Sequence, residues 1–454
     1  MKFTIKKIYI ILFILSILTF HTKGFAKNNN IQYSRENISS YFSGIISLDQ
    51  NQNNNAYKHL KKVQSLKKKH SNFNIQFIKT LVLLERFDQA FSFLKSLEEK
   101  NKLFFEANLL LGLDSFMRND YANAEKHFER LNKISGQSFF FQDFIGNILL
   151  AWTKAAENNK KDSFKFLKKI PNQYYHIVKI QNSFLQCYFE TNETSKYFKE
   201  LINDEDYNFS RYNFFLINYF LSKNRISDAK EVIYSSSEKY SSNLLLNQTR
   251  FFFLNNEKEK IKNFYNCKYP KHSIAEFFYI LANLYSSEKN YQLSNFYLKI
   301  SLFLNSNFST NNTLLAENLY YQKKDRESKK IYFSIKSIGS LYSWHSSKNI
   351  AAILLREKGK KYSVRSLEND FNLLKNPNFN HYYEFANFYK DHEYFEQSIK
   401  YYSIALDKIE KDHFLIPKIL ERRGTSYERL GDWKSAEKDL IDSLKISPDQ
   451  AYVL

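Results

Sequence analysis

The sequence predicts an all-α fold, an α-solenoid of about twelve antiparallel helix pairs spanning residues 38–454. Only 9 Gly and 5 Pro occur in 454 residues, which argues against the many tight turns of an all-β fold. Ala56, Ala90 and Ala124 recur at equal intervals of roughly 34 residues. Short polar segments interrupt the helical periodicity about every 15 to 20 residues, which excludes one long coiled coil.

The most regular repeat lies at residues 423–448. Its landmarks are a glycine and an aromatic residue on a first helix, a Gly-Asp turn, a small and a large residue on a second helix, and a closing proline: Gly424, Tyr427, Gly431, Asp432, Ala436, Leu440 and Pro448. This spacing resembles the tetratricopeptide repeat, although Leu420 and Arg423 stand where that pattern has Trp and Leu. The resemblance implies a right-handed superhelix whose concave groove binds proteins or peptides.

The same pattern can be followed along the chain. Small residues are expected where the paired helices cross closely, and they recur at Gly44, Ala56, Ala90, Gly112, Ala124, Ser163, Thr194, Ala229, Ser294, Ser328, Ser398 and Ala436, with Ala282, Ala316 and Ala386 on first helices. Phe128, Leu298, Tyr332 and Tyr402 follow one turn later. Lys260 and Val364 break the rule. The repeats are most regular at 38–135 and 274–448, and degenerate at 172–270.

The N-terminus has the layout of a secretory signal. Lys2, Lys6 and Lys7 precede an apolar run at residues 8–20, and a small residue stands at Gly24 and at Ala26. We expect residues 1–26 to be a signal peptide and residues 27–37 a short polar leader. The apolar run is shorter than the roughly 20 residues that span a bilayer, and an uncleaved N-terminal anchor is the alternative. The chain is therefore expected to be exported, periplasmic or associated with the envelope of a bacterium.

The two cysteines, Cys187 and Cys267, lie far apart in the sequence. In a regular solenoid their separation corresponds to more than two repeats. Their Cα atoms should then lie beyond the roughly 7 Å that a disulfide can join. We predict two isolated thiols.

The formal net charge of +20 admits two interpretations. One is an anionic partner such as nucleic acid, lipid headgroups or an acidic protein. The other is compositional, because Lys, Asn, Ile, Phe and Tyr are abundant together, as in proteins of AT-rich genomes. The lysines are spread over nearly every repeat, and export argues against nucleic acid. Association with a membrane surface stays open.

Motifs of common catalytic and cofactor sites are absent from the sequence: no phosphate-binding glycine loop, nucleophile elbow, zinc-protease motif or Cys-x-x-Cys occurs. We therefore expect no enzyme activity, no cofactor and no metal. His381 and His392 are the closest histidine pair within one repeat, and they are expected to face apart at the surface.

A binding surface is the remaining candidate. Matching helix phases along the repeats predicts that the groove is lined by Tyr279, Asn283, Tyr320, Tyr321, Tyr383, Asn387 and Lys390. Tyrosine with asparagine suits peptide recognition, because it combines rigid amphipathic area with amide groups. One subset of the family clamps acidic peptide C-termini with lysine and asparagine. Tyr279 and Tyr383 occupy the position of that lysine, so the resemblance does not extend to the clamp.

On another first helix, the positions expected to face the groove are apolar: Leu109, Leu113, Phe116 and Met117. We expect a neighbouring segment to cover it, with a hydrophobic docking site as the alternative.

These observations favour a non-catalytic scaffold of the bacterial cell envelope that binds a protein or peptide in its groove. Two alternatives remain: the arm of an envelope enzyme whose catalytic domain is not in this chain, and a binder of an anionic envelope polymer. Residues 449–454 look like the start of a further helix, so the chain is expected to be C-terminally incomplete.

Overall fold

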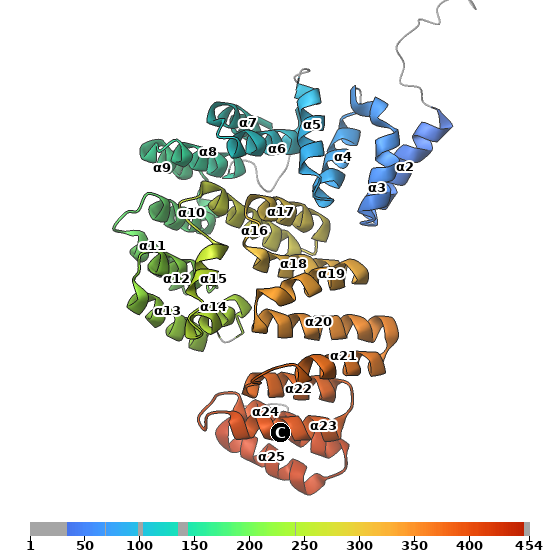
Figure 1. Ribbon diagram of the computed structural model, residues 1–454, viewed down its shortest axis with the longest axis vertical. Helices are drawn as coiled ribbons and strands as arrows, with labels where there is room; N and C mark the ends of the chain where they lie inside the picture. Colours follow the sequence, from blue (N-terminus) through green and yellow to red (C-terminus); the bar gives the residue numbers. More distant parts are fainter. Residues whose placement is uncertain (1–33, 69, 99–102, 135–143, 241, 449–454) are drawn as a thin grey trace, which may run out of the picture. The chain divides into compact units, whose positions relative to one another are not determined.

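The computed structural model describes residues 34–68, 70–98, 103–134, 144–240 and 242–448 (Figure 1). Within these ranges the chain forms 24 α-helices and no strand, and consecutive helices pack in pairs, which confirms the predicted fold class and its twelve pairs. None of the described helices has the length and apolarity that crossing a membrane requires. The predicted signal peptide and residues 449–454 lie outside the described residues.

The helix bounds follow in chain order. The first six pairs are α2 (Arg35–Asp49) with α3 (Asn53–Lys62), α4 (Ser71–Leu83) with α5 (Phe87–Glu98), α6 (Phe105–Met117) with α7 (Tyr121–Ile134), α8 (Phe144–Ala156) with α9 (Lys160–Lys168), α10 (Tyr175–Tyr188) with α11 (Thr194–Ile202), and α12 (Tyr212–Ser222) with α13 (Ile226–Lys239). The helix α2 begins three residues before the predicted start of the array at Ile38.

The other six pairs are α14 (Leu244–Leu254) with α15 (Lys258–Phe264), α16 (Pro270–Ser287) with α17 (Tyr291–Leu304), α18 (Asn312–Tyr321) with α19 (Asp325–Ile335), α20 (Ser340–Lys358) with α21 (Lys360–Asn372), α22 (Phe379–Asp391) with α23 (Phe395–Lys408), and α24 (Ile416–Arg429) with α25 (Trp433–Ile446). The chain divides into two compact units, residues 1–111 and 112–454.

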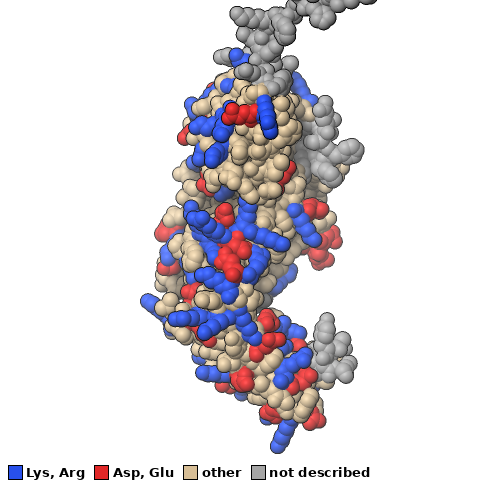
Figure 2. Space-filling view, turned by 90° about the vertical axis from the view of Figure 1, so that its right-hand side faces the viewer, with Lys and Arg blue, Asp and Glu red and all other residues tan. Residues whose placement is uncertain are grey.

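Every pair turns through one residue in the left-handed region of backbone space. These twelve residues are Asn51, Glu85, Asn119, Asn158, Glu190, Asn224, Asn256, Lys289, Lys323, Gly359, Glu393 and Gly431. In eleven of the turns the next residue donates its backbone N–H to the carbonyl five residues earlier, as in a Schellman motif. This hydrogen bond ends the first helix and redirects the chain. The turn from α20 to α21 lies at the right in Figure 1, on the side that faces the viewer in Figure 2.

Close crossing of the paired helices explains the small residues. A Cβ atom added at Gly112 would lie 2.3 Å from the ring of Phe128, and one added at Gly44 would lie 2.6 Å from Leu60. Both large side chains are fully buried. The crossing therefore leaves no room for a side chain on the first helix.

Where serine replaces alanine on the second helix, its hydroxyl bonds to the first helix. In four pairs the Oγ atom donates to the carbonyl of an alanine twelve residues earlier: Ser163 to Ala151, Ser294 to Ala282, Ser328 to Ala316 and Ser363 to Ala351, at 2.6–2.8 Å. The hydroxyl is thus buried with its hydrogen bond satisfied.

The same bond corrects one prediction. The small site of the α20–α21 pair is Ser363, not Val364, because Ser363 makes the interhelical bond and Leu367, one turn later, is fully buried. At Lys260 the rule does fail. That side chain is exposed on the short helix α15, and its neighbour Ile261 is the buried residue.

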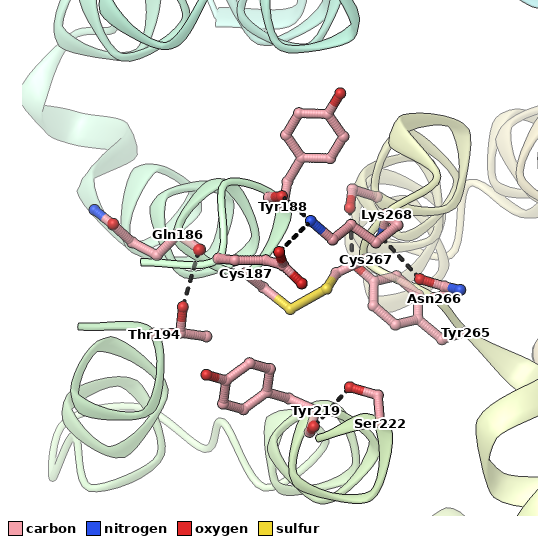
Figure 3. Close-up of a disulfide and its surroundings, with 12 residues drawn as sticks. Gln186, Cys187, Tyr188, Thr194, Tyr219, Ser222, Tyr265, Asn266, Cys267 and Lys268 are labelled. Carbon is pink, nitrogen blue, oxygen red and sulfur yellow. Dashed lines mark hydrogen bonds and ion pairs between the residues drawn. A yellow bond between two sulfur atoms is a disulfide. The ribbon is translucent and has the colours of Figure 1, made fainter. Parts of the chain in front are cut away.

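The middle of the second unit folds back on itself. Helices α8 and α10 contact α16, and α14 contacts α20, although many residues separate them in sequence. The prediction of two isolated cysteines is therefore wrong. Cys187, at the end of α10, and Cys267, just before α16, form a disulfide with a Cα–Cα distance of 5.9 Å (Figure 3). The prediction assumed that repeats contact only their neighbours, and here the array curves tightly enough to bring distant repeats together.

A hydrogen bond and an ion pair join the same segments beside the disulfide. Lys268 donates to the carbonyl of Tyr188 at 3.2 Å (Figure 3). It also pairs with Glu190 at 3.0 Å, and Glu190 pairs in turn with Lys223. A disulfide typically stabilises a protein by about 2–4 kcal/mol.

The expectation of surface histidines is also wrong. His381 and His392 are both buried. His381 forms a capping box with Asn378 at the start of α22, and His392 contacts the carbonyl of Phe388 and the hydroxyl of Ser363.

The close crossing generates a prediction. We expect Gly112→Ala to lower the free energy of unfolding by about 2 kcal/mol, because Phe128 is buried and cannot yield to the new methyl group. Gly424→Ala is the matched control. Its nearest neighbour is the half-buried Leu440 at 3.0 Å, so its loss should be under about 1 kcal/mol. Urea unfolding followed by circular dichroism measures both. A Gly112→Ala protein as stable as the natural one would contradict this account of the crossing.

Candidate interaction surface

A largely buried charge cluster joins three parts of the folded-back region. Arg211, at the start of α12, donates two hydrogen bonds to Glu276 on α16, at 2.7 and 2.9 Å, and a third to Asn311 before α18, at 2.8 Å. The side chain of Glu276 has no exposed surface. Burial raises the pKa of the Glu276 carboxyl, and Arg211 opposes that shift. Arg211 keeps 21% of its side-chain surface exposed, so the fully buried Glu276 depends more on the pair than Arg211 does.

Tyr279, a predicted groove residue, belongs to this cluster. Its ring lies under the Arg211 guanidinium, 3.9 Å from centroid to Cζ, and burial raises the pKa of its hydroxyl. The chain's own arginine thus occupies one face of the ring. Asn283, one turn further along α16, is exposed.

Downstream of the cluster, polar side chains from successive first helices form a line, which we call the polar row. Its members are Glu317 on α18, His345 and Lys348 on α20, Glu384, Asn387 and Lys390 on α22, and Arg422 on α24. His345 lies 3.8 Å from Glu317, and Lys348 pairs with Glu384 at 2.6 Å. The indole N–H of Trp344 donates to the same Glu384 carboxylate.

The histidine of the polar row carries no charge at neutral pH. Burial lowers the pKa of His345 to about 4, and burial also raises the pKa of Glu317. His345 is therefore neutral at pH 7, and its contact with Glu317 is not an ion pair there.

The polar row ends in two cations that lie close together. Lys390 and Arg422 are both half-buried, and burial together with the nearby Arg422 lowers the pKa of Lys390. Arg422 donates from Nη1 to the Asn387 side-chain oxygen at 3.0 Å, which also accepts from Tyr402 at 2.7 Å. Tyr402 also interacts with the Arg422 side chain. Asn387 and Tyr402 thus fix the position of the guanidinium beside Lys390.

The structure thus gathers three predicted residues into one place. Tyr383, Asn387 and Lys390 lie on successive turns of α22, and the ring of Tyr383 is 6.2 Å from that of Tyr402. Matching helix positions between repeats did not predict Arg422, because its position is next to those expected to face the groove. The sequence signal for it is the Arg-Arg pair at Arg422 and Arg423. Arg423 donates two hydrogen bonds to the Asp439 carboxylate, at 2.7 and 2.8 Å.

Tyr320 and Tyr321 lie elsewhere, at the end of α18. The Arg356 guanidinium covers Tyr320, with Cζ 4.3 Å from the ring centroid. Tyr321 is 62% exposed and stacks on Tyr291, the first residue of α17. These two rings therefore belong to the edge of the turns rather than to the polar row.

The apolar stretch on α6 is covered. Leu109, Leu113 and Phe116 are buried and Met117 is half-buried. Among the described residues no group of three or more His, Cys, Asp or Glu side chains has the arrangement of a metal site.

No protein-family model and no curated protein matches the chain. Among solved structures, the chain is similar to one in the crystal structure of the APC/C hetero-tetramer Cut9–Hcn1. The two are 13% identical, the match covers 92% of this chain and 89% of that one, and the TM-score is 0.32. At that score the likeness carries no argument about function, so function has to be inferred from this chain's own residues.

Proposed function

We propose that this chain is a non-catalytic scaffold of the bacterial cell envelope that binds a peptide or protein segment along the part of the polar row that lies on α20, α22 and α24. The observation that carries the proposal is the pair of half-buried cations Lys390 and Arg422, which lie close enough for Arg422 to lower the pKa of Lys390. Burial and a neighbouring like charge both disfavour the charged form of Lys390. A carboxylate of a bound segment would compensate both cations.

The neighbouring groups suit a peptide. The hydrogen bond from Arg422 to Asn387 positions the guanidinium before a ligand binds. Tyr383 and Thr425 offer an aromatic ring and a methyl group, and the Thr425 hydroxyl is turned back to the carbonyl of Glu421 at 2.7 Å. The Lys348–Glu384 pair adds charges of both signs further along the polar row. We expect an extended segment with an acidic group at the Arg422 end.

Peptide selection tests the proposal. Random peptides displayed on phage are panned against the full chain, and the selected peptides are synthesised and titrated. Arg422→Gln and Lys390→Gln should each weaken binding by about 10–100-fold, since a hydrogen bond to a charged group contributes about 1.5–3 kcal/mol. Arg365→Gln is the matched control, because it removes the same charge from an exposed position on α21.

Two results would count against the site. One is a set of selected peptides that bind Arg422→Gln and Lys390→Gln as tightly as the natural chain. The other is a selection that yields no binding peptide at all. Arg422→Lys should restore only part of the affinity, because lysine keeps the charge and loses the planar fork of donors.

The envelope location is supported by the N-terminal sequence pattern and by the disulfide, since disulfides persist in oxidising compartments. Alkylation of thiols tests both together. Full-length chain recovered from a bacterial envelope fraction should have two cysteines that react only after reduction. A chain without residues 1–26 should stay in the cytosol with alkylatable thiols. Equal reactivity and equal location of the two chains would contradict export.

A further inference from the structure

A second surface lies apart from the polar row, along three successive turns. The segments 284–291, 321–329 and 355–362 include the ends of α16, α18 and α20 and the turns that follow them. Side-chain contacts join them into one edge. Tyr291 stacks on Tyr321 with centroids 5.7 Å apart, Arg356 pairs with Asp325, and Lys329 pairs with Glu357. We call these three segments the turn ridge.

The turn ridge is markedly basic. Its cations are Lys289, Lys323, Lys324, Arg326, Lys329, Arg356, Lys358, Lys360 and Lys361, against the acidic residues Glu288, Asp325, Glu327 and Glu357. The basic character stops at the next turn, which carries Asp391, Glu393 and Glu396, and Lys360 pairs with Glu393 across the boundary. Figure 2 shows Lys and Arg side chains along much of this face, several of them close together near its middle, with acidic side chains among them. The excess of cations on the turn ridge itself follows from its nine basic and four acidic residues.

More than half of these cations lack an acidic partner among the described residues. Lys289, Lys323, Arg326, Lys358 and Lys361 are exposed, and none forms an ion pair there. Lys289 and Lys323 occupy the left-handed turn position, which asparagine fills in five other turns. A left-handed lysine is less favourable than asparagine or glycine at that position. The chain thus places cations at the tips of two adjacent turns against the local backbone preference.

Apolar side chains stand among these cations. Tyr321 and Tyr362 are 62% and 58% exposed, and Leu355 is 42% exposed. Lys358 lies 5.7 Å from the ring centroid of Tyr362. Amphipathic rings interleaved with lysines are typical of surfaces that meet the headgroup region of a bilayer.

We propose that the turn ridge docks onto a bilayer surface that carries anionic phosphate headgroups. The cations would meet the phosphates, and Tyr321, Tyr362 and Leu355 would enter the headgroup layer. A row of turn tips suits a flat surface better than a single small molecule, because its charges are spread over three repeats. The polar row stays free for its partner, since none of its residues belongs to the turn ridge.

Vesicle sedimentation tests the proposal. The full chain is mixed at low salt with vesicles of phosphatidylcholine alone or of phosphatidylcholine with a fixed minor share of phosphatidylglycerol. The ratio of the two partition coefficients is the measured anionic preference. The triple variant Lys289→Gln, Lys323→Gln, Lys361→Gln should lose about 100-fold of that preference, since three lysines near an anionic surface together account for about two orders of magnitude in partitioning. The N-terminal segment is the same in every variant, so a change in the ratio reports the turn ridge.

The matched control is Lys161→Gln, Lys230→Gln, Lys438→Gln, which removes three exposed lysines from other helices. Its anionic preference should stay within about threefold of the natural chain, because these positions lie away from the docked surface. Equal losses in the two triple variants would show that diffuse charge attracts the bilayer and would overturn the proposal. So would a natural chain without anionic preference, or one that binds soluble heparin through the turn ridge but not the vesicles. Tyr321→Ser with Tyr362→Ser should weaken binding to both kinds of vesicle.

Discussion

The bonds between Arg211 and Glu276 hold the second unit in its folded-back form. They join the start of α12 to α16, and the third bond of Arg211 reaches Asn311, 100 residues along the chain. A helix-pair array is otherwise held together between neighbours, so its curvature is the sum of small local rotations. Here a largely buried ion pair adds a long-range constraint. The Cys187–Cys267 disulfide adds a second one, between the end of α10 and the segment before α16. Helix α20 packs on α14 within the folded-back region, so the constraint also positions a helix that carries part of the polar row.

The local features of the fold could be predicted from the sequence, and the long-range ones could not. The pairing of helices follows from small residues at the crossing and from polar turns, which are properties of a single repeat. Gly112 is an example, because the space it leaves is filled by Phe128 of the same pair. The disulfide was missed for a physical reason. Cysteines more than two repeats apart cannot meet in a straight array. Long-range contacts such as the bond from Arg211 to Glu276, 65 residues away, have no signal in a single repeat.

The candidate surfaces show the same division. Helix phase predicted Tyr383, Asn387 and Lys390, and the structure gathers them because they lie on one helix. It did not predict Arg422, which lies on the next helix pair. It also did not predict that Arg211 would cover the ring of Tyr279. The turn ridge could not be predicted from the sequence for a related reason. Its lysines come from three repeats and look evenly spread along the chain, and only the packing of those repeats places them on one edge.

The buried pair of Arg211 and Glu276 should stabilise the folded-back form as a unit. A double-mutant cycle in urea unfolding, with Arg211→Met, Glu276→Gln and the double variant, measures this most directly. We expect each single variant to lose about 3–5 kcal/mol, because each leaves a buried charge or donor unpaired, and the double variant to lose far less than the sum. Single losses below about 1 kcal/mol that add up in the double variant would contradict this role, since the curvature would then be set by neighbouring repeats alone.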